Sequence, residues 1–270
     1  KEKLLIWMIH FSPLIWFEGY PWQDYIINQA LENLHNIENW WIDAILIENN
    51  YDLPHTKYLD TEIIVQMTYI AQILRKQTNL PMWICCLWND WKTSLSIAKI
   101  VWLQFVRIPV FVDHIKTHYG YEIKENPQEI INFRKKIWAE NIKIFTDIQV
   151  KHSQLLNQRP LIQSATDAIN SWTDWLIITW NWTWDFPDYW DLKNVREKVW
   201  DFPIIIWSWT TPENIQQWLK YADATIIWTY LKTSFHTKHD INIKSWEEKI
   251  DIEKVKKIIS IIKYKFIKKS

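Results

Sequence analysis

Short apolar runs alternate with longer segments of helical spacing along the whole chain. Within the runs, apolar residues follow one another instead of alternating with polar ones, which is typical of parallel strands covered by helices. Eight strands are predicted in this way, at residues 4–10, 42–48, 82–87, 104–109, 142–150, 175–179, 204–207 and 224–228.

The segments between the runs carry apolar residues three and four positions apart, as helices with one buried face do. Three clear stripes are Ile26, Ala30, Leu31, Leu34 and Ile37; Ile63, Ile64, Met67, Ile70, Ala71 and Leu74; and Ile252, Val255, Ile258, Ile259, Ile262 and Phe266. Eight strand–helix units in 270 residues favour one α/β domain over residues 1–270, a TIM (β/α)8 barrel. A doubly wound open sheet is the alternative.

Two long connections, 49–60 and 110–126, follow the second and fourth predicted strands. Both leave the carboxyl end of a strand, where barrel enzymes carry their active sites. We predict that they cover an active site, and ordinary surface loops are the alternative.

Tryptophan and glycine occur in unusual numbers, 22 and 2. At an average glycine content of about 7%, a chain of this length would hold roughly 19 glycines. Tryptophan also occupies strand ends and helix ends, where the backbone often needs glycine. We therefore hypothesise that most of the tryptophans are glycines in the native protein, encoded by UGA codons that the source reads as glycine. A carbohydrate-binding surface built on real tryptophan platforms is the rival interpretation.

Charge and cysteine content narrow the class of protein. The net charge is zero, so nothing indicates nucleic-acid binding. No apolar stretch is long enough to span a membrane. The adjacent Cys85 and Cys86 cannot bridge each other in a strand, which favours a reducing, cytoplasmic location. A basic tail predicts a solvated helix face, with peripheral membrane contact as the alternative; it contains Lys256, Lys257, Lys263, Lys265, Lys268 and Lys269. A homo-oligomer is compatible with all of this.

The ends of the last two strands form the strongest candidate site. Read with glycine for tryptophan, residues 205–212 become Ile-Ile-Gly-Ser-Gly-Thr-Thr-Pro, and residues 226–229 become Ile-Ile-Gly-Thr. Barrels often hold phosphate at this place through backbone N–H groups, which glycine leaves accessible. The predicted phosphate-binding residues are Trp207, Ser208, Trp209, Trp228 and Thr229, joined by Thr179, Trp180 and Asn181 after the sixth strand. Turns that need glycine without any ligand are the alternative.

Polar residues lie within or just after the other strands. Arg107 and Asp147 stand inside apolar strands, so they must pair with each other or face a polar pocket. We predict a catalytic set of Glu48 as general base, Lys151 as electrophile or phosphate partner, and His10 and Asp147 in proton transfer. Substrate contacts are predicted for Asn49, Asn89, Arg107 and His152.

Cofactor motifs are missing from the sequence. There is no P-loop and no Rossmann fingerprint, even with glycine for tryptophan, so no cofactor is predicted. A divalent metal held by His10, Glu48 and Asp147 is a weaker alternative, since no compact ligand motif is present.

Several motifs resemble the BtpA family, which includes the SgcQ-type proteins. They are residues 7–14 (WMIHFSPL), 43–49 (DAILIEN), 87–90 (LWND), 105–108 (FVRI), 147–152 (DIQVKH) and 207–214 (WSWTTPEN). The resemblance runs from about residue 5 to 232, and the family's glycines fall on tryptophans of this chain. It implies a barrel like the ribulose-phosphate-binding barrels. It also ties the family name to photosystem I biogenesis at the membrane surface in cyanobacteria, and SgcQ-type members to sugar metabolism.

Two functions remain open at this point. The first is an enzyme acting on a small phosphorylated metabolite of the sugar-phosphate type, as isomerase, aldolase or lyase. The second is a non-catalytic assembly factor for a membrane complex. Polar residues at so many strand ends favour the enzyme, because a scaffold does not need a charged pocket.

Overall fold

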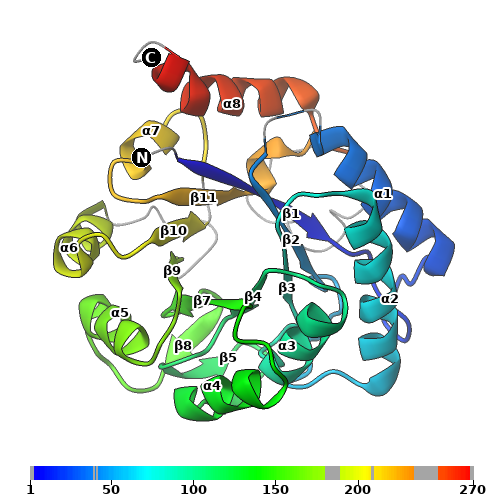
Figure 1. The fold of residues 1–270 in the computed structure, drawn as a ribbon, viewed down its shortest axis with the longest axis horizontal. Coiled ribbons are helices and arrows are strands. Elements are labelled where there is room, and N and C mark those ends of the chain that lie inside the picture. The colour runs from blue at the N-terminus through cyan, green and yellow to red at the C-terminus, as the bar shows by residue number, and fades with distance from the viewer. Residues whose placement is uncertain are drawn as a thin grey trace.

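Eight parallel strands form a closed barrel, in the order β1-β11-β10-β9-β7-β4-β3-β2 (Figure 1). The computed structural model describes residues 3–38, 40, 42–179, 189–207, 210–233 and 249–267. The barrel strands are β1 (Leu4–His10), β2 (Ala44–Glu48), β3 (Met82–Cys85), β4 (Phe105–Ile108), β7 (Lys143–Ile148), β9 (Trp175–Ile178), β10 (Ile204–Trp207) and β11 (Ala224–Ile227). The predicted TIM barrel is confirmed, and the open sheet is excluded because β1 pairs with both β2 and β11.

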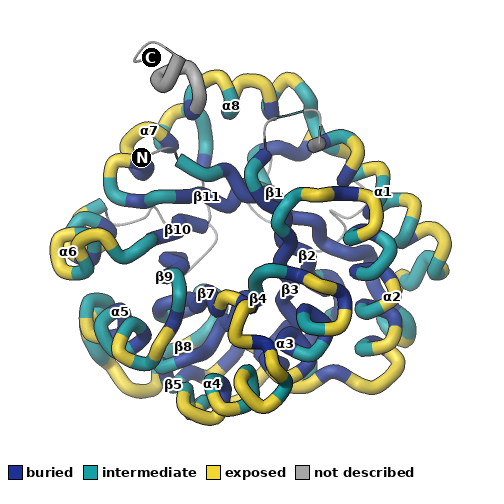
Figure 2. The backbone as a smooth tube through the Cα atoms, viewed as in Figure 1, coloured by how far each residue is buried: buried dark blue, intermediate teal, exposed yellow. Residues whose placement is uncertain are grey.

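Helices surround this barrel as an outer ring, with their outward sides exposed and the strands buried (Figures 1 and 2). They are α1 (Gln23–Glu38), α2 (Thr61–Gln77), α3 (Trp91–Ile100), α4 (Pro127–Lys136), α5 (Leu161–Asn170), α6 (Tyr189–Val199), α7 (Ile215–Trp218) and α8 (Ile252–Ile267). A short 3-10 helix, η1 (Thr229–Leu231), precedes α8. No helix in these described ranges is long and apolar enough to cross a membrane.

The strands are apolar on both faces because each face meets a different core. In β1, Ile6 and Met8 belong to the core inside the barrel, whereas Leu5 and Ile9 belong to the core between strands and helices. Successive side chains of a strand point to opposite faces, so a continuous apolar run fills both cores. This explains why the apolar residues of each predicted strand follow one another in a continuous run.

The connection after β4 contains structure that the sequence pattern did not predict. Two short strands, β5 (His114–Thr117) and β6 (Glu122–Lys124), pair antiparallel and are joined by β8 (Ser153–Leu155). They share a small apolar cluster of their own, which includes Ile115 and Ile123. Strands of three or four residues with mixed polarity are too short to show periodicity, so residues 110–126 were predicted only as a connection.

Tryptophans occupy left-handed backbone positions at several helix ends. Trp102, Trp138, Trp172 and Trp200 follow α3, α4, α5 and α6 with φ of 61, 56, 73 and 52°. After three of these helices the next residue donates its N–H five residues back, as in Leu103 to Ala98 (2.9 Å), Ala139 to Arg134 (2.9 Å) and Thr173 to Ala168 (3.2 Å). This is the Schellman ending, in which the left-handed position is usually glycine. These tryptophans therefore occupy backbone positions of the kind that glycine usually takes.

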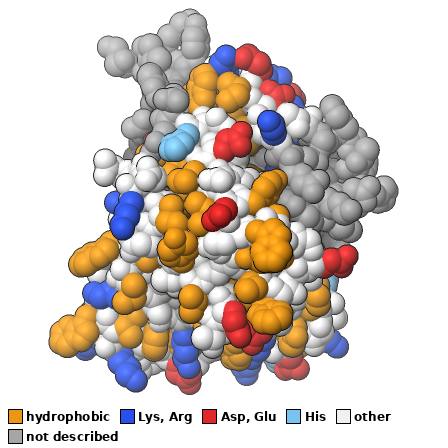
Figure 3. Space-filling view, turned by 90° about the vertical axis from the view of Figure 1, so that its right-hand side faces the viewer, with side chains coloured by type: hydrophobic (Ala, Val, Ile, Leu, Met, Phe, Trp, Pro, Cys, Tyr) orange, Lys and Arg blue, Asp and Glu red, His pale blue; other side chains and the backbone are white. Residues whose placement is uncertain are grey.

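The face formed by α1 and α2 carries hydrophobic side chains scattered among charged ones (Figure 3). Exposed apolar or aromatic residues of these helices include Tyr25, Val65 and Tyr69.

The two cysteines, Cys85 and Cys86, are both buried and unbridged. Neither cysteine is therefore held in a disulfide.

Candidate active site

Four strands each place one ionisable side chain inside the mouth of the barrel. His10 and Glu48 are the last residues of β1 and β2 and pair in register. Arg107 and Asp147 come from β4 and β7, each two residues after a phenylalanine at 105 or 145 that packs in the barrel interior. Because side chains alternate along a strand, all four point inward at the carboxyl end of the barrel.

Arg107 joins three of these strands through its guanidinium group. Its Nε and Nη2 bond the two oxygens of Asp147, each at 2.8 Å, and its Nη1 lies 2.6 Å from Oε1 of Glu48. The second oxygen of Glu48 lies 3.3 Å from Nε2 of His10. A buried chain of contacts therefore runs from His10 through Glu48 and Arg107 to Asp147, with each member less than 10% exposed.

The charges of these four contacting side chains determine which of them are ionised. Burial alone would raise the pKa of Glu48, but the charge of Arg107 and the contact with His10 lower it to about 2, so Glu48 is a carboxylate. Burial lowers the pKa of His10, against the attraction of Glu48. Both ring nitrogens of His10 are buried without a hydrogen-bond partner in the described parts of the chain, although Nε2 lies 3.3 Å from Glu48. A neutral ring that carries its proton on Nε2, next to Glu48, would keep Nδ1 as an acceptor.

Lys151 extends into the same pocket from the loop after β7. Its backbone N–H donates to Oγ1 of Thr179 at 3.0 Å, which ties the loop to the end of β9. Burial and then the positive charge of Arg107 lower the pKa of Lys151 to about 8. Part of the Lys151 population is therefore a neutral amine near neutral pH.

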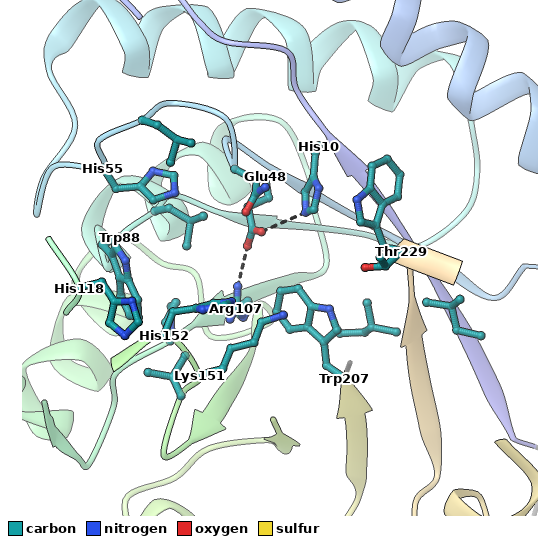
Figure 4. A pocket seen from close by; sticks show the side chains of 18 of the residues that line it. His10, Glu48, His55, Trp88, Arg107, His118, Lys151, His152, Trp207 and Thr229 are labelled. Carbon is teal, nitrogen blue, oxygen red and sulfur yellow. Dashed lines mark hydrogen bonds and ion pairs between the residues drawn. The ribbon is translucent and has the colours of Figure 1, made fainter. Parts of the chain in front are cut away.

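The pocket opens above this chain, and its two sides differ in character. His55, His118 and His152 lie on one side and Trp207 and Thr229 on the other, with Glu48, Arg107 and Lys151 between them (Figure 4). Burial lowers the pKa of His55 to about 4, and burial with the charge of Lys151 lowers that of His152 to about 3. His55 and His152 on this side are thus neutral imidazoles.

Two indoles cover the cationic groups of the pocket. Trp207 lies over the guanidinium carbon of Arg107 at 3.9 Å and over Nζ of Lys151 at 4.9 Å. Trp228 lies over Nζ of Lys232 at 4.1 Å, with its ring centroid 4.7 Å from that of His10. A smaller residue at 207 or 228 would leave these cations facing the pocket.

Some predicted substrate-binding residues lie behind the pocket wall. Asn49 accepts from the N–H of Leu87 (2.8 Å) and donates to Asp52 (3.0 Å). Asn89 bonds both the N–H and the carbonyl of Val110, at 2.8 and 3.0 Å. Both amides therefore hold loops in place, and the geometry favours a supporting role. Trp180, Asn181, Ser208 and Trp209 lie outside the described residues.

Two pocket histidines, and a lysine next to the pocket, were not singled out from the sequence. His55 and His118 come from the two long connections predicted to cover the site, so histidines within those connections could have been included. Lys232 follows η1, is 3% exposed, and its Nζ lies 3.3 Å from the hydroxyl of Tyr51. Nothing in the local sequence distinguishes it from other lysines.

The metal alternative finds no support in the arrangement of ligands. Glu48 and Asp147 are both bonded to Arg107, a cation that would compete with a metal ion. Across the described ranges, no group of three or more His, Cys, Asp or Glu side chains is placed to hold a metal ion.

Solved structures of similar fold align over nearly the whole of both chains. N-(5'-phosphoribosyl)anthranilate isomerase from Pyrococcus furiosus matches with a TM-score of 0.58 at 12% identity, covering 97% of this chain and 100% of that one. Orotidine 5'-phosphate decarboxylase from Pyrococcus horikoshii matches with a TM-score of 0.55 at 12% identity, covering 96% and 99%. At such low identity these matches show the fold alone.

Sequence relatives cover nearly the whole chain. MJ1115 of Methanocaldococcus jannaschii is 31% identical over 264 residues, 97% of this chain and 95% of its own length. The photosystem I biogenesis protein BtpA of Synechocystis is 28% identical over 209 residues, 77% and 72% of the two chains. The putative sgc region protein SgcQ of Escherichia coli is 24% identical over 235 residues, 86% and 87%. The profile of the BtpA family matches residues 1–264, and the chain therefore belongs to the BtpA family.

Proposed function

We propose that the protein is an enzyme that acts on a small phosphorylated metabolite at the carboxyl end of its barrel. The observation that carries this proposal is the composition of one pocket. It combines an ionised Glu48, a histidine with an unpartnered buried nitrogen, and a lysine of lowered pKa. A purely structural barrel does not need such a set, whereas proton transfer next to a carbonyl does.

The phosphate would bind at the ends of β10 and β11. Thr210, Thr211 and Thr229 line the pocket there, and the cation Lys232 lies beside it under Trp228. Phosphate sites of barrels are commonly formed by these two turns. The names of two structural neighbours contain a phosphoribosyl and a 5'-phosphate group, which supports a phosphorylated ligand for this fold.

This site requires glycine in place of the indoles, and three observations support glycine. Six tryptophans in the described ranges have a positive φ of 52 to 77°, and the two glycines of the chain are also left-handed, at 84 and 87°. The same six side chains are 70 to 81% exposed and so bury little surface. The indole nitrogens of Trp7 and Trp83 are buried without a hydrogen-bond partner in the described chain, which is costly. The intact mass of protein from its natural source counts the replacements, and peptide masses show which positions carry glycine.

Within the site, each group has a distinct role. Glu48 orients His10, whose Nδ1 accepts a proton from the substrate, and Lys151 faces a developing negative charge or a carbonyl carbon. Asp147 is bonded on both oxygens by Arg107, so it positions Arg107 and does not transfer protons itself. Isomerase, aldolase and lyase reactions all use groups of this kind.

A non-catalytic assembly factor is the second candidate. It is favoured by one observation, the name of the Synechocystis relative as a photosystem I biogenesis protein. The two functions differ in whether the pocket must be occupied by a small molecule.

A thermal-shift screen of phosphorylated metabolites distinguishes them. The protein is prepared as the Trp207→Gly/Trp228→Gly variant, and a ligand at 100 times its dissociation constant should add about 2.7 kcal/mol of stability. Glu48→Gln, which keeps the shape of the side chain, should weaken the response to the true substrate. If no phosphorylated compound shifts the melting temperature, the enzyme proposal is wrong and the assembly factor takes its place.

A further inference from the structure

We infer that Lys151 forms a covalent imine with the carbonyl group of the substrate. This inference rests on the proposed function and adds a reaction class to it. The substrate is then a phosphorylated aldehyde or ketone, and the enzyme works through an iminium intermediate. The argument depends on the position of Lys151, on the groups around it and on the histidine across the pocket.

The position of Lys151 is suited to attack on a bound ligand. The loop after β7 brings its side chain to the centre of the pocket, between Arg107 and Trp207 (Figure 4). The backbone of the same residue is held by Thr179, so the side chain starts from a fixed point. Its neighbour His152 lines the side of the same pocket that carries His55 and His118, at a φ of 60°.

The groups around Lys151 favour its neutral form. The two barrel carboxylates near it, Glu48 and Asp147, are each bonded to Arg107 at 2.6 to 2.8 Å. Their charge is therefore largely satisfied by the guanidinium, while the guanidinium itself repels a second cation. The lowered pKa of Lys151, about 8, is consistent with this environment. A desolvated lysine beside another cation is a recognised nucleophile toward carbonyl compounds.

The covalent step balances without a further reactant. The neutral Nζ attacks the carbonyl carbon, and the C–N bond forms as the carbonyl π electrons move to oxygen, which takes a proton. The resulting carbinolamine loses its hydroxyl group, with a proton, as water. The product is a protonated imine, so one amine, one carbonyl and one proton yield one iminium and one water.

His10 lies where the next proton must go. An iminium withdraws electrons from the neighbouring carbon, so a proton on that carbon becomes acidic. His10 lines the pocket, and its buried Nδ1 has no hydrogen-bond partner in the described chain, so it can accept this proton; the nearby Glu48 carboxylate would stabilise the imidazolium that forms. The iminium, Lys151 and the His10–Glu48 pair thus form one proton-transfer unit.

Borohydride trapping tests this inference. The Trp207→Gly/Trp228→Gly protein is incubated with dihydroxyacetone phosphate, glyceraldehyde 3-phosphate or ribulose 5-phosphate, reduced with sodium borohydride and analysed by peptide mass spectrometry. We expect a reduced adduct on the peptide that contains Lys151. Lys151→Arg should abolish it, and Lys116→Arg, an exposed lysine on β5, should not.

Glycerol 3-phosphate separates this inference from the proposed function. It carries the phosphate but has no carbonyl, so it should stabilise both the parent protein and Lys151→Arg without being trapped. Stabilisation by glycerol 3-phosphate with no adduct from any carbonyl compound would overturn the imine and leave the phosphate site standing. An adduct spread equally over exposed lysines would also overturn it. Absence of both stabilisation and adduct would overturn the proposed function as well.

Discussion

Arg107 balances two carboxylates that come from other strands of the barrel. It is 4% exposed, and it is the cation that contacts both Glu48 and Asp147. A buried pair of this kind contributes little net stability compared with apolar residues, because desolvation offsets the attraction. Removal of one partner is different, since the remaining charges stay buried without compensation.

Arg107→Met should therefore destabilise the fold by about 3–5 kcal/mol, measured by urea unfolding. The matched control is Arg134→Met, which removes a more exposed pair with Asp174 at 3.2 Å and should cost less than about 1 kcal/mol. Equal effects of the two substitutions would show that the network in the barrel mouth is not energetically distinct from a surface ion pair.

At the scale of the elements, the apolar pattern predicts where a helix lies but not the backbone conformation of the residue that ends it. Apolar spacing predicts where α2 and α8 lie, because a helix buries one stripe of its surface. The same spacing says nothing about a left-handed residue after a helix. Tryptophan is present at these ends in this chain, and the Schellman hydrogen bonds identify the positions as glycine-like.

Trp138→Gly should consequently stabilise the protein relative to Trp138→Ala by about 1 kcal/mol, because alanine removes the indole but keeps the Cβ clash of a left-handed backbone. At Val65, an exposed position inside α2, the order should reverse, with glycine less stable than alanine by about 1 kcal/mol. Thermal unfolding of the four variants measures both differences. A preference for alanine at both positions would contradict the glycine hypothesis.

At the scale of the whole molecule, the fold brings histidines from separate loops to one side of the pocket. His55 comes from the connection after β2 and is 6% exposed, with its pKa lowered by burial from 6.5 to about 4. Between these two values the unfolded chain binds more protons than the folded chain. Stability contributed by neutral His55 is therefore present above pH 6.5 and is lost as the pH falls toward 4.

We expect the free energy of unfolding to fall by about 2 kcal/mol between pH 7 and 5 through His55 alone. His55→Asn should reduce this dependence, as seen in urea unfolding at several pH values. His35→Asn, at an exposed position on α1, serves as the control and should leave the pH dependence unchanged. An unaltered slope in the His55 variant would mean that His55 is not held neutral by burial.

The alternation of apolar runs and helical stripes was enough to predict the barrel, because strands covered on both faces and helices covered on one face leave distinct periods in the sequence. Placement of polar residues at strand ends also indicated His10, Glu48, Arg107 and Lys151 as pocket residues. These predictions depend only on the spacing of apolar and polar residues along the chain, which can be read directly from the sequence.

Only the tertiary structure decided which of these residues meet. Arg107 and Asp147 are 40 residues apart in the chain, and Arg107 and Glu48 are 59 apart, so closure of the barrel alone brings them within hydrogen-bond distance. Likewise, His118 reaches the pocket through a turn between two short strands that leave no period in the sequence. Contacts between distant segments depend on how elements pack, and that packing is a property of the whole fold.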